Sequence, residues 1–125
     1  MRVFVTGGTG FVGKHTLRRL VEGGHKVRCL VRRTSHTSEE LETLGCEFAP
    51  GDVTDKESVL EGMRGCEWVV HLASVYSYWE PEKDIYRSVN VEGTRNVMEA
   101  ALQRRVQKVV HVSTLVVWGK QRSRS

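Results

Sequence analysis

The chain has 125 residues, of which 39% are hydrophobic and 27% are charged, a balance that is ordinary for one folded domain. Its formal net charge is +4, but most of its basic residues are scattered along the sequence, so nucleic acid is not an expected partner. No stretch approaches the roughly 20 apolar residues that span a bilayer, and the N-terminus lacks a signal-peptide pattern. We therefore expect no membrane partner and a cytoplasmic location.

Cysteines and histidines do not form a metal-binding pattern. The three cysteines, Cys29, Cys46 and Cys66, are widely spaced and form no Cys-x-x-Cys motif, which supports neither a zinc site nor a redox motif. His71 and His111 lie in apolar strand-like runs, where a hydrogen-bonded core histidine is the favoured interpretation. We predict buried thiols and no metal site.

The first predicted element is a strand over residues 2–6, which runs directly into the glycine-rich segment TGGTGFVG at residues 6–13. Apolar residues at helical spacing then predict a helix that ends at Gly23-Gly24. The three glycines at G-x-x-G-x-x-G spacing permit a sharp turn, leave backbone N–H groups open to a pyrophosphate, and let the helix pack close to the strand. The segment predicts a dinucleotide-binding loop; the alternative is a glycine-rich turn that binds nothing.

Residues 26–31 predict the second strand, and Arg32-Arg33 follow its end. An NAD-specific site usually offers Asp or Glu at this point for the ribose hydroxyls, whereas the first acidic residue here is Glu39. The fixed fork of donors in an arginine suits a 2′-phosphate, so Arg32 favours NADP, with NAD as the alternative cofactor. Two solvated arginines on a surface turn are the competing interpretation.

The middle of the chain predicts two short helices and a short strand. Ser38 precedes the first helix, which Gly45 ends, and residues 46–49 form the third strand. A second helix is predicted over residues 55–64, with Thr54 as its N-cap and Glu57 completing a capping box.

Residues 67–72 predict a fourth strand, and residues 74–82 predict a loop rich in aromatic side chains. A long helix from about Ile85 to Arg104 and a fifth strand over residues 106–112 complete the pattern. Strands and helices alternate with crossovers long enough for parallel pairing, and right-handed crossovers give the strand order 3-2-1-4-5. The fold class is therefore α/β: a doubly wound parallel Rossmann sheet of five strands, truncated before a sixth.

Five segments in chain order resemble the extended short-chain dehydrogenase/reductase superfamily, which includes sugar-nucleotide epimerases, dehydratases and dihydroflavonol reductases. They are the glycine loop, Gly51-Asp52-Val53-Thr54-Asp55, His71-Leu72-Ala73-Ser74, Asn90-Val91-Glu92-Gly93-Thr94, and Val112-Ser113-Thr114 followed by Val117-Trp118-Gly119. Five ordered matches are far more specific than any one of them, and together they cover the whole chain.

The resemblance implies a role for the matched residues. Asp52 would accept a hydrogen bond from the adenine amino group, and Asn90 would hold the main chain near the active site. Thr114 is the predicted catalytic residue, whose hydroxyl would hydrogen-bond a substrate oxygen, since Ser113 faces the opposite side of the strand. The residues predicted to bind the cofactor are Thr6, Gly7, Gly10, Phe11, Val12, Gly13, Arg32, Asp52, Val53, Leu72, Ala73, Ser74 and Asn90.

Each of these roles has a structural alternative. Asp52 could be an N-cap or a turn aspartate, Asn90 a polar residue on a packed helix, and Thr114 a β-branched residue that ends a strand. Ala73 and Ser74 would contact the ribose and nicotinamide through their backbone.

The Tyr-x-x-x-Lys motif of the superfamily is absent from the chain, because the residues four positions after Tyr76, Tyr78 and Tyr86 are acidic or asparagine. We interpret residues 1–119 as the N-terminal dinucleotide-binding portion of an oxidoreductase or epimerase that transfers hydride between NADP or NAD and a carbonyl or alcohol substrate. Residues 120–125 would form a frayed basic tail. Alone, the chain is expected to be inactive; the alternative function is a non-catalytic NADP-binding module or pseudoenzyme remnant.

The predicted fifth strand is apolar on both faces, as a central parallel strand should be. Without a sixth strand it becomes an exposed edge, so self-association through this edge is expected. A small-molecule substrate is the other expected partner, and the aromatic loop is too generic to identify it.

Overall fold

The computed structural model describes residues 1–7, 11–31, 43, 45–77 and 82–117. In chain order its elements are β1 (Arg2–Thr6), α1 (Phe11–Glu22), β2 (Lys26–Val31), β3 (Glu47–Pro50), α3 (Lys56–Met63), β4 (Trp68–Ser77), α4 (Glu82–Arg104) and β5 (Lys108–Val117). Within these residues no helix has the length and apolar character needed to cross a membrane.

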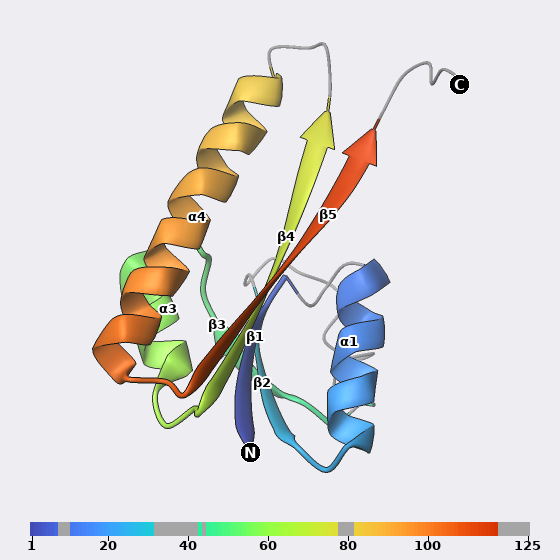
Figure 1. Cartoon of the computed structure of the whole chain (residues 1–125), viewed down its shortest axis with the longest axis vertical. Coiled ribbons are helices and arrows are strands. Elements are labelled where there is room, and N and C mark those ends of the chain that lie inside the picture. Colours follow the sequence, from blue (N-terminus) through green and yellow to red (C-terminus); the bar gives the residue numbers. More distant parts are fainter. Residues whose placement is uncertain (8–10, 32–42, 44, 78–81, 118–125) are drawn as a thin grey trace.

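The five strands form one parallel sheet in the order β3-β2-β1-β4-β5, which confirms the predicted fold class. In chain order, β2 lies beside the central strand β1, and β3 lies beyond β2 on the same side. The chain then crosses to the other side of β1 and continues through β4 to β5 (Figure 1). The strand order of the sheet therefore reverses between β1 and β4.

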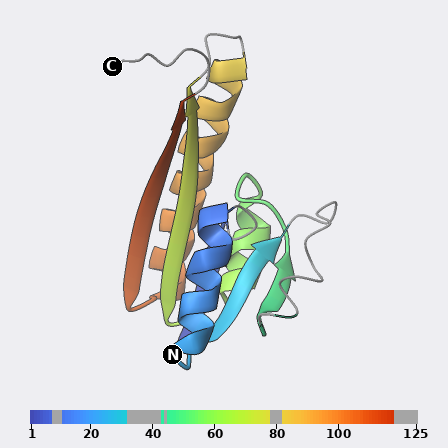
Figure 2. The ribbon, with the colours of Figure 1, turned by 90° about the vertical axis from the view of Figure 1, so that its right-hand side faces the viewer.

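Helices cover both faces of this sheet, with α3 and α4 on one face and α1 on the other (Figure 2). Because successive side chains of a strand point to opposite faces, β1 contributes to two separate cores. Phe4 packs with Val59, Met63 and Val97 of the two helices on one side, and all four side chains are fully buried. On the other side Val3 and Val5 pack with Leu17 of α1.

The predicted cap of α3 is wrong by one residue. Asp55 is the N-cap, and its side chain accepts a hydrogen bond from the backbone N–H of Glu57 at 3.2 Å. Thr54 lies in the preceding turn, where its N–H donates to Oδ1 of Asp52 at 3.1 Å. The predicted capping box therefore does not form, because the turn after β3 already uses the Thr54 backbone.

Strands β4 and β5 are longer than predicted and pair with each other over ten positions, from Trp68 with Lys108 to Ser77 with Val117. Residues 74–77, which the sequence predicted as loop, continue β4, and the rest of that loop to residue 81 lies outside the described residues. The β-branched and aromatic composition of both segments favours this extension. The pair projects past the carboxyl ends of the other strands (Figure 1).

The remaining element ends differ from prediction by a few residues. Helix α4 begins at Glu82 rather than near Ile85, β3 covers Glu47–Pro50 rather than 46–49, and β5 begins at Lys108 rather than at residue 106. The predicted helix after Ser38 lies almost entirely outside the described residues; of it, the helical residue Thr43 is described. The three cysteines are buried thiols that form no disulfide with one another, as predicted.

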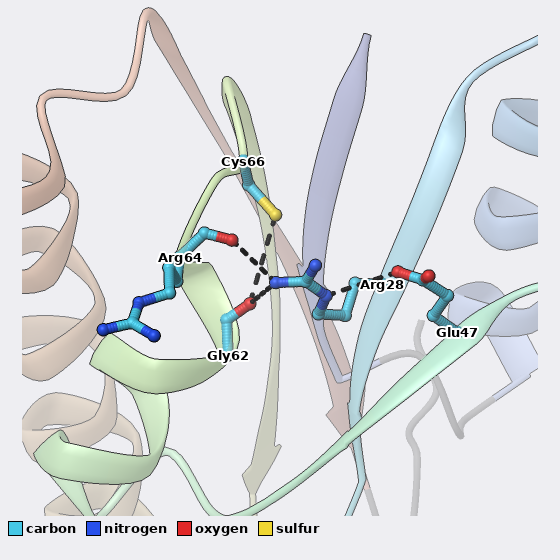
Figure 3. A network of polar contacts seen from close by, with 5 residues as sticks. All are labelled: Arg28, Glu47, Gly62, Arg64 and Cys66. Atoms are coloured by element: carbon cyan, nitrogen blue, oxygen red, sulfur yellow. Dashed lines mark hydrogen bonds and ion pairs between the residues drawn. The ribbon is translucent and has the colours of Figure 1, made fainter.

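Arg28 of β2 fastens the C-terminal end of α3 to the sheet (Figure 3). Its Nη1 donates to the carbonyl oxygens of Gly62 and Arg64, each at 2.8 Å, and its Nε lies 3.4 Å from Oε1 of Glu47 on β3. The last carbonyls of a helix lack helical partners and carry partial negative charge, so a cation there is favourable. One guanidinium thus links α3, β2 and β3.

Arg28→Met should lower the free energy of unfolding by about 1–3 kcal/mol, because it removes charge-assisted hydrogen bonds from a side chain that is only 23% exposed. Urea unfolding followed by circular dichroism measures this change. Arg64→Met is the matched control, since it removes the same charge from an exposed side chain while keeping the accepting carbonyl, and it should change stability by less than about 0.5 kcal/mol. Equal losses in the two variants would contradict the role of Arg28.

Candidate functional site

The candidate site lies at the carboxyl ends of the strands, at the point between β1 and β4 where the strand order of the sheet reverses. In open parallel sheets this position leaves a crevice that binds ligands. Several of the predicted site residues lie in these strands or directly after them. Thr6 ends β1, Asp52 follows β3, Leu72 lies in β4, and Thr114 lies in β5.

The glycine turn begins against β4. Gly7 directly follows β1 and has a φ of 77°, a conformation that side chains rarely adopt. A Cβ atom at this position would also overlap the carbonyl oxygen of Leu72 on β4. Gly7 is thus required both by its backbone angle and by the closeness of the neighbouring strand, while Gly10 lies outside the described residues.

Helix α1 begins at Phe11, so Phe11, Val12 and Gly13 form its first turn. Gly13 is buried within the helix. No acidic side chain occupies this first turn, which leaves the positive end of the helix dipole without a competing carboxylate. A helix start of this kind, reached through glycines, fits the pyrophosphate of a dinucleotide.

His71 links three elements beneath the glycine turn. It lies on β4 opposite Thr6, and its Nδ1 shares a hydrogen bond with the Thr6 hydroxyl. Its Nε2 lies 3.0 Å from Oγ1 of Thr94 on α4. The side chain is only 3% exposed, so the interpretation of His71 as a hydrogen-bonded core histidine is confirmed. His111, by contrast, is exposed and stacks on His71 at 5.2 Å between ring centroids, so the core interpretation is wrong for His111.

Burial, with a smaller contribution from the nearby His111, lowers the pKa of His71 from 6.5 to about 4. The imidazole is therefore neutral near pH 7. A neutral ring can donate from one nitrogen and accept at the other, which suits its two hydroxyl partners. The sequence signal for this bridge was weak, because Thr6 and His71 are 65 positions apart.

The loop that carries Asp52 is held by short contacts on several sides. The N–H of Gly51 donates to the carbonyl of Val31, the last residue of β2, at 3.0 Å. The Ser58 hydroxyl of α3 accepts from the N–H of Asp52 at 3.1 Å and lies 3.0 Å from the Asp52 carbonyl oxygen. Together with the Thr54 contact described above, this shows that Asp52 shapes the turn, as its structural alternative proposed.

Val53 lies against α4. A Cβ at Gly93 would come within 2.7 Å of Cγ2 of Val53, so the helix approaches the loop closely because this residue is glycine. The side-chain amide of Asn96 donates to the Val53 carbonyl oxygen at 2.8 Å. The sequence analysis did not identify Asn96. A glycine inside a long helix is a signal of close approach that could have pointed to this contact.

For the remaining predicted residues the structure gives backbone positions. Ser74 pairs with Thr114, and Ala73 pairs with Ser113, in the ladder between β4 and β5. Asn90 lies within α4. Arg32 falls outside the described residues. Across the part of the chain that the structure describes, no three histidine, cysteine or acidic side chains are grouped so that they could hold a metal ion.

The neutral state of His71 predicts a pH-dependent stability. Between about pH 6.5 and pH 4 the unfolded chain binds a proton at this histidine and the folded chain does not, so the free energy of unfolding should fall as the pH is lowered, by up to about 3 kcal/mol. Urea unfolding at several pH values measures the slope. In His71→Gln this contribution should vanish, and parallel pH profiles for the two proteins would contradict the prediction.

Comparison with known proteins gives the same fold. A protein-family model, the NAD dependent epimerase/dehydratase family, matches residues 3–125. The chain is 39% identical over 117 residues to a 4-hydroxy-2-methyl-3-oxo-4-farnesyl-3,4-dihydroquinoline-1-oxide ketoreductase of Stigmatella aurantiaca, covering 94% of this chain and 34% of the relative. The chain spans about a third of the length of the curated relatives it matches.

Solved structures agree. The crystal structure of gox2253 is 41% identical, with a TM-score of 0.78, and the alignment covers 87% of this chain and 33% of that one. A UDP-glucose-4-epimerase of Stenotrophomonas maltophila with bound NAD is 28% identical, with a TM-score of 0.75, over 89% of this chain and 36% of that one. Because the family model matches nearly its whole length, this chain belongs to the NAD dependent epimerase/dehydratase family.

Proposed function

We propose that this chain binds a nicotinamide dinucleotide, with NADP preferred over NAD, and supplies the cofactor-binding part of an oxidoreductase or epimerase. The reaction would transfer hydride between the nicotinamide and a carbonyl or alcohol carbon. A relative that is a ketoreductase and a similar structure that holds NAD support this reaction class.

One observation carries the proposal: Gly7, which directly follows β1, lies against β4 at the point where the strand order of the sheet reverses. Gly7 closes tightly on β4, and α1 starts four residues later without acidic side chains in its first turn. Backbone N–H groups at this helix start would hold the pyrophosphate. Leu72, Ala73 and Ser74 continue β4 beside the turn and would border the ribose and nicotinamide.

The preference for NADP depends on Arg32. This residue directly follows Val31, whose carbonyl accepts from Gly51 at the start of the Asp52 loop. In the sequence, an arginine follows the end of β2 and an aspartate follows the end of β3, and both would serve the adenosine half of the cofactor. A charge-assisted hydrogen bond contributes roughly 1.5–3 kcal/mol, so one contact to a 2′-phosphate could favour NADP about ten- to a hundredfold.

Within this proposal Thr114 would donate a hydrogen bond to a substrate oxygen from β5. The Tyr-x-x-x-Lys motif that would supply general acid–base catalysis is absent from these 125 residues, so we expect cofactor binding without appreciable turnover. A non-catalytic NADP-binding module would need the same glycine turn and the same Arg32. The enzyme and the non-catalytic module can be distinguished by testing whether a chain that carries the motif reduces carbonyl substrates.

Titration of NADPH and NADH by the quenching or enhancement of nicotinamide fluorescence tests the cofactor assignment. The chain should bind NADPH more tightly, and Arg32→Asp should reverse the preference, because a carboxylate repels the 2′-phosphate and accepts from ribose hydroxyls. Arg64→Asp makes the same change of charge at the opposite end of the strands and should leave the preference unaltered. Unchanged relative affinities in Arg32→Asp would refute the role of Arg32, and binding of neither cofactor would refute the function.

We also propose that the chain self-associates through β5. In the described residues β5 pairs only with β4, and Val110 on this strand is 37% exposed. Sedimentation velocity at tens of micromolar should show species heavier than a monomer, and Val110→Lys should shift the distribution toward the monomer, because charge on an edge strand opposes pairing. A monomeric wild-type chain at these concentrations would contradict the proposal.

A further inference from the structure

We propose that Asn96 on α4 is a positioning residue for the adenosine end of the cofactor site, a role that rests on the proposed function above. It would act through the backbone of the Asp52-Val53 loop and would not itself touch the cofactor. The carrying contact is the hydrogen bond from Nδ2 of Asn96 to the Val53 carbonyl oxygen, at 2.8 Å.

The loop is held from two helices at successive residues. Ser58 of α3 binds the backbone of Asp52 through its hydroxyl, and Asn96 of α4 binds the backbone of the next residue. A backbone carbonyl between a strand and a helix has no partner from regular secondary structure, so a side-chain donor is needed to satisfy it away from water. Fixing a loop at two neighbouring peptide groups removes most of its rotational freedom.

The same stretch of α4 is also linked, through His71, to the end of β1. Gly93 lets the helix approach Val53, and Thr94 binds His71, which in turn binds Thr6 at the end of β1. One helical turn therefore contacts both the loop after β3 and the support beneath the loop after β1. These two loops would hold the pyrophosphate and the adenosine of one dinucleotide, so their separation has to match a ligand of fixed length.

The packing of α3 on α4 is stabilised by contacts that do not involve Asn96. Arg104 donates from Nε to the carbonyl of Leu60 at 3.0 Å, and Lys56 pairs with Glu99 at 2.9 Å. Both contacts join the two helices away from the Val53 carbonyl. A variant at Asn96 can therefore disturb the loop while the helices stay docked, and Arg104 offers a control that loosens the helices without touching the loop.

The test compares Asn96→Ala and Asn96→Asp with Arg104→Ala. Fluorescence titration with NADPH and calorimetric titration with ADP-ribose measure affinity at the adenosine end, and thermal unfolding measures global stability. Loss of one hydrogen bond should weaken the binding of both ligands about fivefold in the two Asn96 variants. Arg104→Ala should retain affinity within about twofold even where its melting temperature falls. Asn96→Asp keeps the size of the side chain but cannot donate, which separates the hydrogen bond from the volume of the residue.

Amide hydrogen exchange of the ligand-free chain provides the second readout. In Asn96→Ala the amides of Asp52 and Thr54 should exchange about fivefold faster, with no change at the amides of β1. Unaltered affinity in both Asn96 variants beside a wild-type chain that binds NADPH would overturn the inference, as would equal weakening in Arg104→Ala. A wild-type chain that binds neither NADPH nor NADH would instead overturn the proposed function, and the inference with it.

Discussion

The direct pairing of β1 with β4 is the constraint on which the rest of the molecule depends. It joins residues about 65 positions apart, and it reverses the strand order at the centre of the sheet. The pairing sets Gly7 against the carbonyl of Leu72 and places Thr6 beside His71. A shift of this register by one residue would exchange the side chains that β1 sends into its two cores and separate these partners, so fold and site are specified by the same contact.

The buried imidazole of His71 shows how that pairing is made specific. An apolar residue at this position would fill the space but would leave the hydroxyls of Thr6 and Thr94 without these partners. A neutral histidine satisfies both and ties the sheet to α4. This arrangement makes the support of the glycine turn polar but uncharged, in a place where a proton would be costly.

The sequence predicted the elements and the strand order well because these follow from local signals. Apolar runs, glycine stops and crossover lengths lie within short windows, and the handedness of the crossovers leaves few topologies. It predicted the ends of β4 and β5 poorly, since the extension from Ser74 to Ser77 is stabilised by a partner strand some 40 positions away. The N-cap of α3 is Asp55 and not Thr54, because the backbone N–H of Thr54 donates to the side chain of Asp52. A sequence motif does not show such competition between neighbouring residues. At the site, the sequence identified residues such as Gly7 directly, because a glycine after a strand has one dominant structural role, which is to permit a tight turn. Asn96 was missed because its partner is a backbone carbonyl, which no side-chain pattern reveals.

The distance along the chain between β1 and β4 also has a consequence for biosynthesis. Once β1 and β2 have emerged from the ribosome, one edge of β1 stays open until the segment around His71 follows. About 40 residues lie between the end of β2 at Val31 and His71, and at about 5–20 residues per second their synthesis takes roughly 2–8 s, which is long compared with hairpin or helix formation. During that interval the nascent chain presents Val3, Phe4 and Val5 beside an unpaired strand edge, a target for chaperones and for neighbouring chains on the same message.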